Sequence, residues 1–322
     1  MQNSDGVVFS YFLYCRRNAM KSYSAILIGN GIMGARHRAR FEACGVRFVQ
    51  IVDAGDSVCD DAVDFAVVAS PATTHYAYAK HFLERGVPVF VEKPLATSAE
   101  EAQELVNLSL RNGVKLFVAQ SECYNPLFLN FRKHFLSELN KLCVARKSPP
   151  TGDVATPLVH LEFRREHRPS NRCLDVGVSL DLMVHDFSLF LTMFPYRDIR
   201  VESMNESPDG NYAQAKLKVA SGPFAGVSAD FVVDRESATD LRNITVIFPR
   251  NGELPSSSYT VSLARYTSEG EIAHIPDSLD NEHKFFLKLL AGACGHWGRR
   301  AAQNAADCVR LAVSGEVIGS GR

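Results

Sequence analysis

Gly29-Asn30-Gly31-Ile32-Met33-Gly34 follows directly after the apolar run Ala25-Ile26-Leu27-Ile28, and this junction decides the fold of the N-terminal part of the chain. An apolar strand that runs into G-x-G-x-x-G and then into a helix is the arrangement that binds a dinucleotide. The first glycine allows a tight turn, the second lets the backbone approach a pyrophosphate, and the third lets the helix pack closely on the strand. The motif alone is weak evidence, but residues 35–44, which are compatible with a helix, follow it here.

The next apolar run, residues 46–52, ends in Asp53. An acid at this place can accept hydrogen bonds from the ribose of an adenosine. Because a carboxylate repels a 2′-phosphate, and no Arg or Lys follows before Asp64, Asp53 favours NAD over NADP. NADP stays possible if Arg36 or Arg38 overrides this preference.

Length and composition place the chain among ordinary globular proteins. Its 322 residues suffice for two domains, with 46% hydrophobic and 22% charged residues. The net charge of −1 gives no electrostatic reason to expect nucleic acid or an anionic membrane as partner. No apolar run approaches the roughly 18 residues that span a bilayer. The eight cysteines are scattered without a C-x-x-C pair, which argues against disulfides and a metal site and for a reducing cytoplasm.

The first residues read differently from the rest. Asp5 stands where a signal peptide carries positive charge, and Met20 would make a natural start, so residues 1–21 are expected to be an extension without fixed structure. The alternative is a signal or lipoprotein anchor that ends near Cys15. We expect a dinucleotide-binding domain at 22–121, a substrate and oligomerisation domain at 122–300, and a C-terminal helix at 301–322.

Strands and helices alternate up to residue 120. Strand patterns at 63–70, 87–91 and 115–119 are separated by helix patterns at 74–85 and from Ser98 to Asn112, with Ser98 and Glu101 in capping-box spacing. This rhythm predicts a doubly wound parallel sheet, so the fold class is α/β with an N-terminal Rossmann domain.

Beyond residue 120 the pattern changes to strands in which polar and apolar residues alternate. They lie at 158–164, 212–219, 226–233, 243–248 and 259–264, and few helices interrupt them, apart from 179–194 and two near the C-terminus. The second domain is therefore expected to hold a large, open, mixed and mainly antiparallel sheet. Residues 226–233 carry apolar side chains that one layer of helices cannot wholly cover, which predicts a homodimer or homotetramer.

A polar stripe runs along the apolar helix expected at 179–194. Ser179 is its expected N-cap, and a spacing of four places Asp181 beside His185 on one face. A carboxylate beside an imidazole raises its basicity and fixes its orientation, which suits a general acid or base. The alternative is a buried Asp–His pair that only holds the helix to the sheet.

Two further motifs follow strands at the edge where open α/β sheets bind ligands. Glu92-Lys93-Pro94 places a lysine that can contact both a nicotinamide and a substrate hydroxyl, unless Lys93 is only a surface residue. Ser70-Pro71-Ala72-Thr73-Thr74-His75 would line the cofactor channel. The expected cofactor site comprises Gly29, Asn30, Gly31, Ile32, Met33, Gly34, Asp53, Ser70, Pro71, Thr74, His75, Glu92 and Lys93.

Together these pieces resemble the Gfo/Idh/MocA oxidoreductase family, which includes glucose–fructose oxidoreductase and inositol dehydrogenase. The resemblance covers about residues 22 to 318 and rests on residues 29–34 with His37, Ser70-Pro71-x-x-Thr74-His75, Glu92-Lys93-Pro94, Tyr124-Asn125-Pro126, and residues 177–186. It implies that Lys93, Asp181 and His185 match the family's catalytic lysine and its Asp-x-x-x-His pair. It also implies a C-terminal α/β domain whose open sheet often forms an oligomer interface.

The chain departs from the family between Asp53 and Asp64. Members usually carry a helix, a short strand and a second helix there, whereas only ten residues remain here, from Ala54 to Val63. The adenine side of the cofactor groove is therefore expected to be more open or differently closed. This weakens the preference for NAD that was drawn from Asp53.

The expected function is an NAD(P)-dependent oxidoreductase acting on a secondary hydroxyl of a sugar, nucleotide-sugar or cyclitol. His185 would take the hydroxyl proton, Asp181 would orient His185, and Lys93 would polarise the oxygen. The expected substrate-binding residues are Tyr124, Asn125, Arg164, Arg172 and His185, with Arg165 and Arg168 as further cations before the helix. Two alternatives stay open: a sensor of this fold that binds the dinucleotide without catalysis, and a biliverdin-reductase-like reductase.

Overall fold

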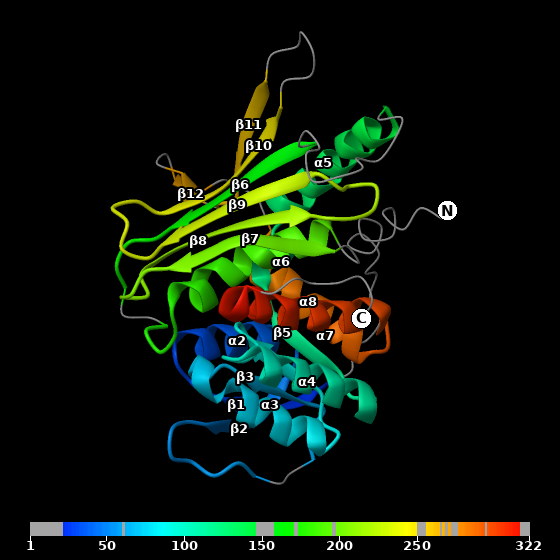
Figure 1. Cartoon of the computed structure of the whole chain (residues 1–322). Helices are drawn as coiled ribbons and strands as arrows, with labels where there is room; N and C mark the ends of the chain where they lie inside the picture. Colours follow the sequence, from blue (N-terminus) through cyan, green and yellow to red (C-terminus); the bar gives the residue numbers. More distant parts are fainter. Residues whose placement is uncertain are drawn as a thin grey trace.

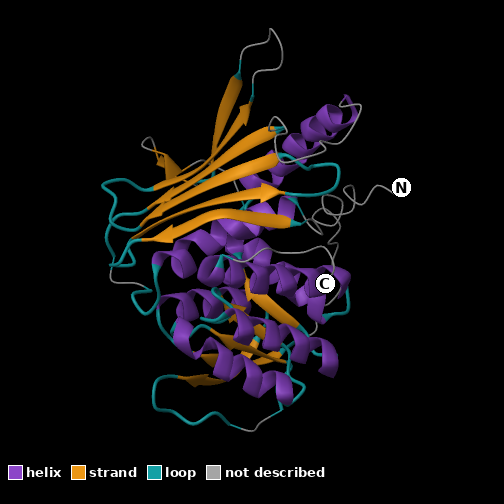
Figure 2. Cartoon of the chain, viewed as in Figure 1, coloured by secondary structure: helices purple, strands orange, loops and turns teal. Residues whose placement is uncertain are grey.

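The structure, a computed structural model, describes residues 22–59, 62–145, 158–170, 173–194, 198–249, 256–264, 266–267, 270–271, 276–293 and 295–315. The expected N-terminal extension and Arg172 lie outside these ranges. Two large sheets lie one above the other with helices packed between them, and a third, short pair of strands stands beside the upper sheet (Figures 1 and 2). Within the described ranges, no helix is both long and apolar enough to cross a membrane.

The first sheet is parallel and has the strand order β2-β1-β3-β4-β5, so the predicted doubly wound sheet is confirmed. Its strands are β1 (Ser24–Ile28), β2 (Arg47–Val52), β3 (Phe65–Val68), β4 (Val89–Glu92) and β5 (Leu116–Ala119). The inner strands β3 and β4 are buried throughout, because helices cover both faces of the sheet. The strand order reverses between β1 and β3, and ligands of open α/β sheets bind at such a switch point.

Helices from both ends of the chain cover this sheet. They are α2 (Ile32–Ala43), α3 (His75–Glu84) after the 3₁₀ turn η1 (Ala72–Thr74), α4 (Ala99–Asn112), α7 (Ser278–Leu290) and α8 (Gly295–Ser314). Phe286 of α7 packs on Phe65 and Phe90 on the face that α2 covers, and α8 lies beside α4 on the other face. The sequence predicted two helices near the C-terminus, but it did not predict that they pack on the first sheet.

The shortened segment after β2 changes one edge of the sheet. Described residues 53–59 and 62–64 form neither helix nor strand, so β2 is the edge strand. Gln50 ties the loop back to this edge, because its Nε2 donates to the Ser57 carbonyl at 2.9 Å and its Oε1 accepts from the Cys59 N–H at 2.8 Å. These two contacts hold the loop against the edge of the sheet.

The second sheet has the order β11-β10-β6-β9-β8-β7 and is antiparallel except for the pair β6–β9, which confirms the mixed sheet. Its strands are β6 (Val159–Glu166), β7 (Ile199–Glu206), β8 (Tyr212–Val219), β9 (Val227–Asp234), β10 (Leu241–Phe248) and β11 (Ser257–Ser262), and β12 (Tyr266–Thr267) pairs separately with β13 (Gly270–Glu271). The sequence analysis missed β7 and the helix α5 (Pro126–Ala145). The start of α5 was visible in Asn125-Pro126, since the Asn125 Oδ1 accepts from the Leu127 N–H at 3.0 Å and proline favours the first helical position.

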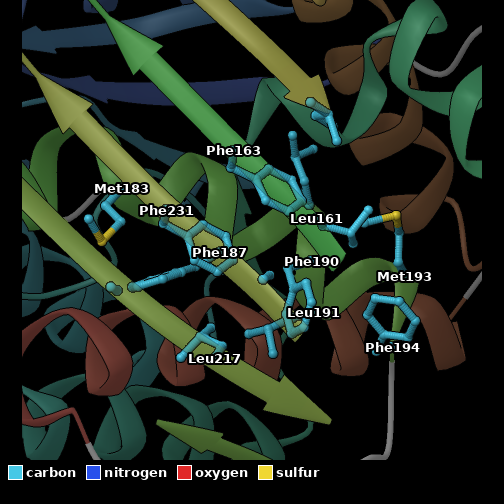
Figure 3. Packing of buried hydrophobic residues seen from close by; sticks show 14 of the residues in the cluster. Leu161, Phe163, Met183, Phe187, Phe190, Leu191, Met193, Phe194, Leu217 and Phe231 are labelled. Carbon is cyan, nitrogen blue, oxygen red and sulfur yellow. The ribbon is translucent and has the colours of Figure 1, made fainter. Parts of the chain in front are cut away.

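One face of this sheet packs on helix α6 (Val184–Met193). Phe163 of β6 stacks on Phe231 of β9 with centroids 4.7 Å apart, and Phe187 and Phe190 of α6 pack against them (Figure 3). The apolar residues of β9 point almost entirely to this inner face.

The outer face of the second sheet carries Ser228, Asp230 and the ion pair from Lys216 to Asp230 at 3.4 Å. The apolar residues on which the oligomer expectation depended are therefore mostly covered within the chain. The expectation of an oligomer itself stays a prediction.

Candidate active site

The glycine turn lies between β1 and α2, against Ser70 at the end of β3. Gly29 has φ of 88°, and a Cβ on it would lie 2.6 Å from the Ser70 backbone N. A Cβ on Gly34 would lie 1.9 Å from the Gly29 carbonyl oxygen, so the fold itself requires both glycines. A Cβ on Gly31 would meet no protein atom within 4 Å, and the first turn of α2 has neither a side-chain cap nor an acidic residue. Uncapped N–H groups with open space before them suit a pyrophosphate, so these residues fit a dinucleotide.

Other expected cofactor residues surround this turn. Asn30 and Ile32 are exposed and Met33 is partly buried. Asp53 is exposed directly after β2, and its Oδ1 accepts from the backbone N–H of Ala54 at 2.9 Å. Among the described residues, no group forms a hydrogen bond with the second carboxylate oxygen of Asp53, which lies where the ribose is expected.

The Ser70 loop is held by its own side chains. The Thr74 hydroxyl donates to the Pro71 carbonyl at 2.8 Å and lies 2.7 Å from the Ser70 hydroxyl. His75 is buried, with Nδ1 2.7 Å from the Pro94 carbonyl and Nε2 2.9 Å from the Ser70 carbonyl. His75 therefore joins two strand-end loops to each other rather than facing a channel.

Lys93 and Asp181, which are far apart in the sequence, form an ion pair. The Lys93 Nζ donates to the Asp181 Oδ1 at 2.6 Å and to the Asp181 carbonyl at 2.8 Å. Both side chains are largely buried, at 14% and 11% exposure. Two hydrogen bonds to one residue hold the Lys93 side chain in one place.

Asp181 lies in a π-helical turn, η3 (Ser179–Met183), that precedes α6. Turns of this type are rare and occur frequently at functional sites. The predicted N-cap at Ser179 was wrong: within the described part of the chain the buried Ser179 hydroxyl has no hydrogen-bond partner, and the Glu206 carboxylate accepts the Ser179 N–H at 2.8 Å. Gly177 makes room for this contact, because a Cβ there would lie 2.2 Å from the Glu206 Oε1.

His185 stands without the expected carboxylate bond. Its Nδ1 is buried and forms no hydrogen bond with any residue that the structure describes, and Asp181 bonds to Lys93 instead. Burial, followed by the positive charges of Lys93, Arg165 and Arg242, lowers the pKa of His185 well below its ordinary value. The expectation that Asp181 raises the basicity of His185 was therefore wrong, and His185 is neutral at neutral pH. A buried polar atom without a protein partner is typical of a catalytic or ligand-binding group.

A buried charge network next to His185 was missed by the sequence analysis. Arg165 of β6 binds Asp186 with Nη2–Oδ1 at 2.8 Å and Glu122 with Nη1–Oε1 at 3.2 Å. Arg242 of β10 donates to the same Glu122 oxygen at 3.0 Å, while 49% of its side chain stays exposed. Glu122 belongs to the short turn η2 (Ser121–Tyr124), so four separate elements meet here.

The expected substrate residues lie in different places. Successive strand residues point to opposite faces, so Arg164 lies on the outer face, where it pairs with Glu166, while Arg165 points toward α6. The side-chain amide of Asn125 is used within the protein. Its Nδ2 donates to the Glu122 carboxylate and the Leu263 carbonyl, and its Oδ1 accepts from the Leu127 N–H. The Tyr124 ring packs on Phe117 and Phe285. Only His185 of this set lies beside Lys93, and Arg172 lies outside the described residues.

Comparisons with known proteins agree with this arrangement. Residues 32–120 match the model of a family described as an oxidoreductase family with an NAD-binding Rossmann fold. The chain is 28% identical over 233 residues to inositol 2-dehydrogenase of Acidothermus cellulolyticus, covering 70% of this chain and 62% of that protein. It is 26% identical over 185 residues to UDP-N-acetylglucosamine 3-dehydrogenase of Acidithiobacillus ferrooxidans, covering 56% of this chain and 52% of that protein. The matches thus span between half and two thirds of these relatives' length.

Solved structures share the whole fold. A structure of the Acidithiobacillus ferrooxidans enzyme superposes with a TM-score of 0.65 at 20% identity, covering 92% of this chain and 99% of that chain. GenD2 from gentamicin A biosynthesis, solved in complex with NAD, has a TM-score of 0.63 at 19% identity, covering 95% and 99%. At this identity the likeness concerns the fold.

Proposed function

Because residues 32–120 belong to the Gfo/Idh/MocA oxidoreductase family with its NAD-binding Rossmann fold, we propose that the protein oxidises a secondary hydroxyl. The substrate class is a sugar, nucleotide-sugar or cyclitol, which the names of the relatives support. The observation that carries the proposal is the buried Lys93–Asp181 ion pair beside a neutral His185.

The residues divide the chemistry between them. Neutral His185 accepts the hydroxyl proton, while the Lys93 ammonium stabilises the negative charge that develops on the same oxygen. Asp181 acts on Lys93, which it holds by its carboxylate and its carbonyl. A nicotinamide cofactor, held at its pyrophosphate by residues 29–34, would supply the acceptor for the hydride that leaves the substrate carbon. The substrate thus loses a proton and a hydride, and the proton stays on His185.

NAD is the proposed cofactor. The exposed Asp53 carboxylate at the end of β2 would repel a 2′-phosphate. Arg36 and Arg38 are the two arginines that could attract a 2′-phosphate in spite of Asp53. The Arg38 Nε already binds the Glu42 carboxylate at 2.8 Å, so Arg36 is the remaining candidate. NADP stays the alternative.

The test is an assay of NAD⁺ and NADP⁺ reduction with inositols and UDP-N-acetylglucosamine as substrates. His185→Ala should lower kcat by about 10²–10⁴-fold, the usual contribution of a general base. Lys93→Ala and Asp181→Asn should also lower kcat, and combined variants should lose less than the product of the single losses, because the three residues act as a unit. Lys141→Ala, on an exposed part of α5, is the matched control and should keep full activity.

Two results would contradict the proposal. A folded wild-type protein that binds NADH but reduces neither cofactor with any of these polyols would point to the non-catalytic sensor. Undiminished kcat in a folded His185→Ala variant would show that the pair of histidine and lysine has only a structural role.

A further inference from the structure

Helix α7 carries polar residues into the interior behind the candidate active site. Glu282 and His283 are fully buried, although α7 is the last helix but one and was not expected at this site. The His283 ring packs in an aromatic cluster, with centroids 4.3 Å from Phe41 and 5.3 Å from Phe90. A buried histidine and a buried carboxyl in such surroundings require an explanation.

His283 begins a chain of hydrogen bonds that ends at the backbone of Lys93. The His283 Nδ1 donates to the Leu279 carbonyl, and its Nε2 lies 3.0 Å from the Nδ1 of His37. The His37 Nε2 lies 2.6 Å from the Glu92 Oε1, and the other Glu92 oxygen accepts the Lys93 N–H at 3.0 Å. The chain therefore joins α7, α2 and the carboxyl end of β4.

The chemistry of the acceptors assigns the protons along this chain. A carbonyl oxygen only accepts, so the His283 Nδ1 carries a hydrogen. Burial, followed by the charge of His37, lowers the pKa of His283 to about 3, so the ring is neutral and its Nε2 is an acceptor. The His37 Nδ1 must then donate to it.

One more proton lies between His37 and Glu92. Burial raises the pKa of Glu92, but hydrogen bonding by His37 and nearby positive charges, that of Lys93 included, bring this pKa below its ordinary value. A carboxylate only accepts, so the proton between the His37 Nε2 and the Glu92 Oε1 would lie on His37 when Glu92 is ionised. Positive and negative groups would then alternate from α2 to η3: His37, Glu92, Lys93 and Asp181.

Glu282 adds no negative charge to this chain. Both of its carboxyl oxygens are buried, and no side chain among the described residues forms a hydrogen bond with them. Burial and the neighbouring negative charge of Glu92 raise the pKa of Glu282 well above its ordinary value and so favour the neutral acid, against a smaller opposing effect of the Gln120 backbone.

We infer that His283 is a positioning residue for Lys93. Its Nε2 accepts a hydrogen bond from the His37 Nδ1 and so keeps His37 doubly protonated. The doubly protonated His37 in turn fixes the Glu92 carboxylate, which holds the Lys93 backbone N–H. The inference rests on the proposed function, in which Lys93 is catalytic. Without the acceptor, neutral His37 can still donate to Glu92 from Nε2, and the cluster loses one positive charge. The Lys93 ammonium would then be attracted by an uncompensated Glu92 as well as by Asp181.

Two substitutions separate this role from simple packing. His283→Phe keeps an aromatic ring in the cluster but has no acceptor. His283→Gln gives up the ring but can place an amide oxygen near the position of Nε2. If His283 positions Lys93, the glutamine variant should keep the higher kcat. If His283 only fills the aromatic cluster, the phenylalanine variant should keep the higher kcat.

The first readout is the ¹⁵N NMR spectrum of the histidine rings in the protein without ligands. Both nitrogens of His37 should be protonated at neutral pH in the wild type and in His283→Gln, and only one in His283→Phe. A wild-type His37 with one protonated nitrogen would overturn the inference. This measurement needs no substrate, so it decides the inference even if the protein turns over none of the polyols and the proposed function fails.

The second readout is turnover. In His283→Phe, kcat should fall by about 10²-fold, the effect of a displacement of about 1 Å at a catalytic group, with NADH affinity unchanged. His283→Gln should retain most of kcat. An active phenylalanine variant beside an impaired glutamine variant would overturn the inference. If neither variant folds, the wild-type spectrum still decides it.

Discussion

At the scale of single residues, the charges around His185 decide what it can do. Lys93, Arg165 and Arg242 all oppose protonation of the imidazole, and burial opposes it more strongly than any of them. Of the three cations, Arg242 alone combines this influence with a side chain that is half exposed. It can therefore be replaced with little disturbance of the interior.

Arg242→Met should shift the acidic limb of the pH–rate profile. Oxidation requires neutral His185, so activity falls as the pH drops below the pKa of His185, which lies below the ordinary 6.5. Removing a positive charge favours the imidazolium and raises this pKa, so the limb should move to higher pH. Arg111→Met, an exposed substitution on α4, is the control and should leave the limb in place. An unchanged limb in Arg242→Met would show that another group controls the profile.

At the scale of elements, the glycines of the turn between β1 and α2 differ in whether the surrounding protein leaves room for a side chain. Gly29 and Gly34 are needed because β1, the Ser70 loop and α2 come too close for a side chain. Gly31 is under no such constraint from the protein. The space beside Gly31 agrees with the proposed approach of a cofactor pyrophosphate to this turn.

This difference predicts opposite effects of two alanine substitutions. Gly34→Ala should lower the free energy of unfolding by about 1–3 kcal/mol, the usual cost of overpacking, as measured by urea denaturation. Gly31→Ala should change it by less than about 0.5 kcal/mol and instead weaken NADH binding in calorimetry. Equal stability of the two variants, or unchanged NADH affinity in Gly31→Ala, would contradict the assignment.

At the scale of the whole molecule, buried charges help to hold the second sheet to the helices beneath it. Arg165 joins β6 to α6 through Asp186 and to η2 through Glu122, and it is only 3% exposed. Its sequence neighbour Arg164 lies on the outer face with 61% of its side chain exposed.

The two neighbouring arginines make a matched pair for a stability measurement. Arg165→Leu leaves Asp186 and Glu122 buried, with only Arg242 to pair Glu122, and should cost about 3–5 kcal/mol of unfolding free energy. Arg164→Leu should cost less than about 0.5 kcal/mol, because exposed ion pairs contribute little. Similar losses in both variants, measured by chemical denaturation, would contradict this division of faces.

Assembly belongs to the same scale and stays a prediction. The outer face of the second sheet is polar in β8 and β9, so the apolar argument for a homodimer or homotetramer no longer supports it.

The sequence by itself determined what depends on neighbours along the chain. The glycine turn, the parallel strands that follow it and the cap of α4, where the Ser98 hydroxyl accepts the Glu101 N–H at 3.2 Å, all follow from short-range spacing. The place of Lys93 at a strand end was predictable for the same reason.

Only the tertiary structure decided which distant groups meet. Spacing placed Asp181 beside His185, but a lysine 88 residues away in sequence takes its carboxylate, since a full charge within hydrogen-bond reach outweighs a neutral ring. His37 and His283 are 246 residues apart, and no local pattern marks them as partners. Burial favours these contacts, because a polar group that has lost its water regains free energy by bonding to a partner that the packed interior brings to it.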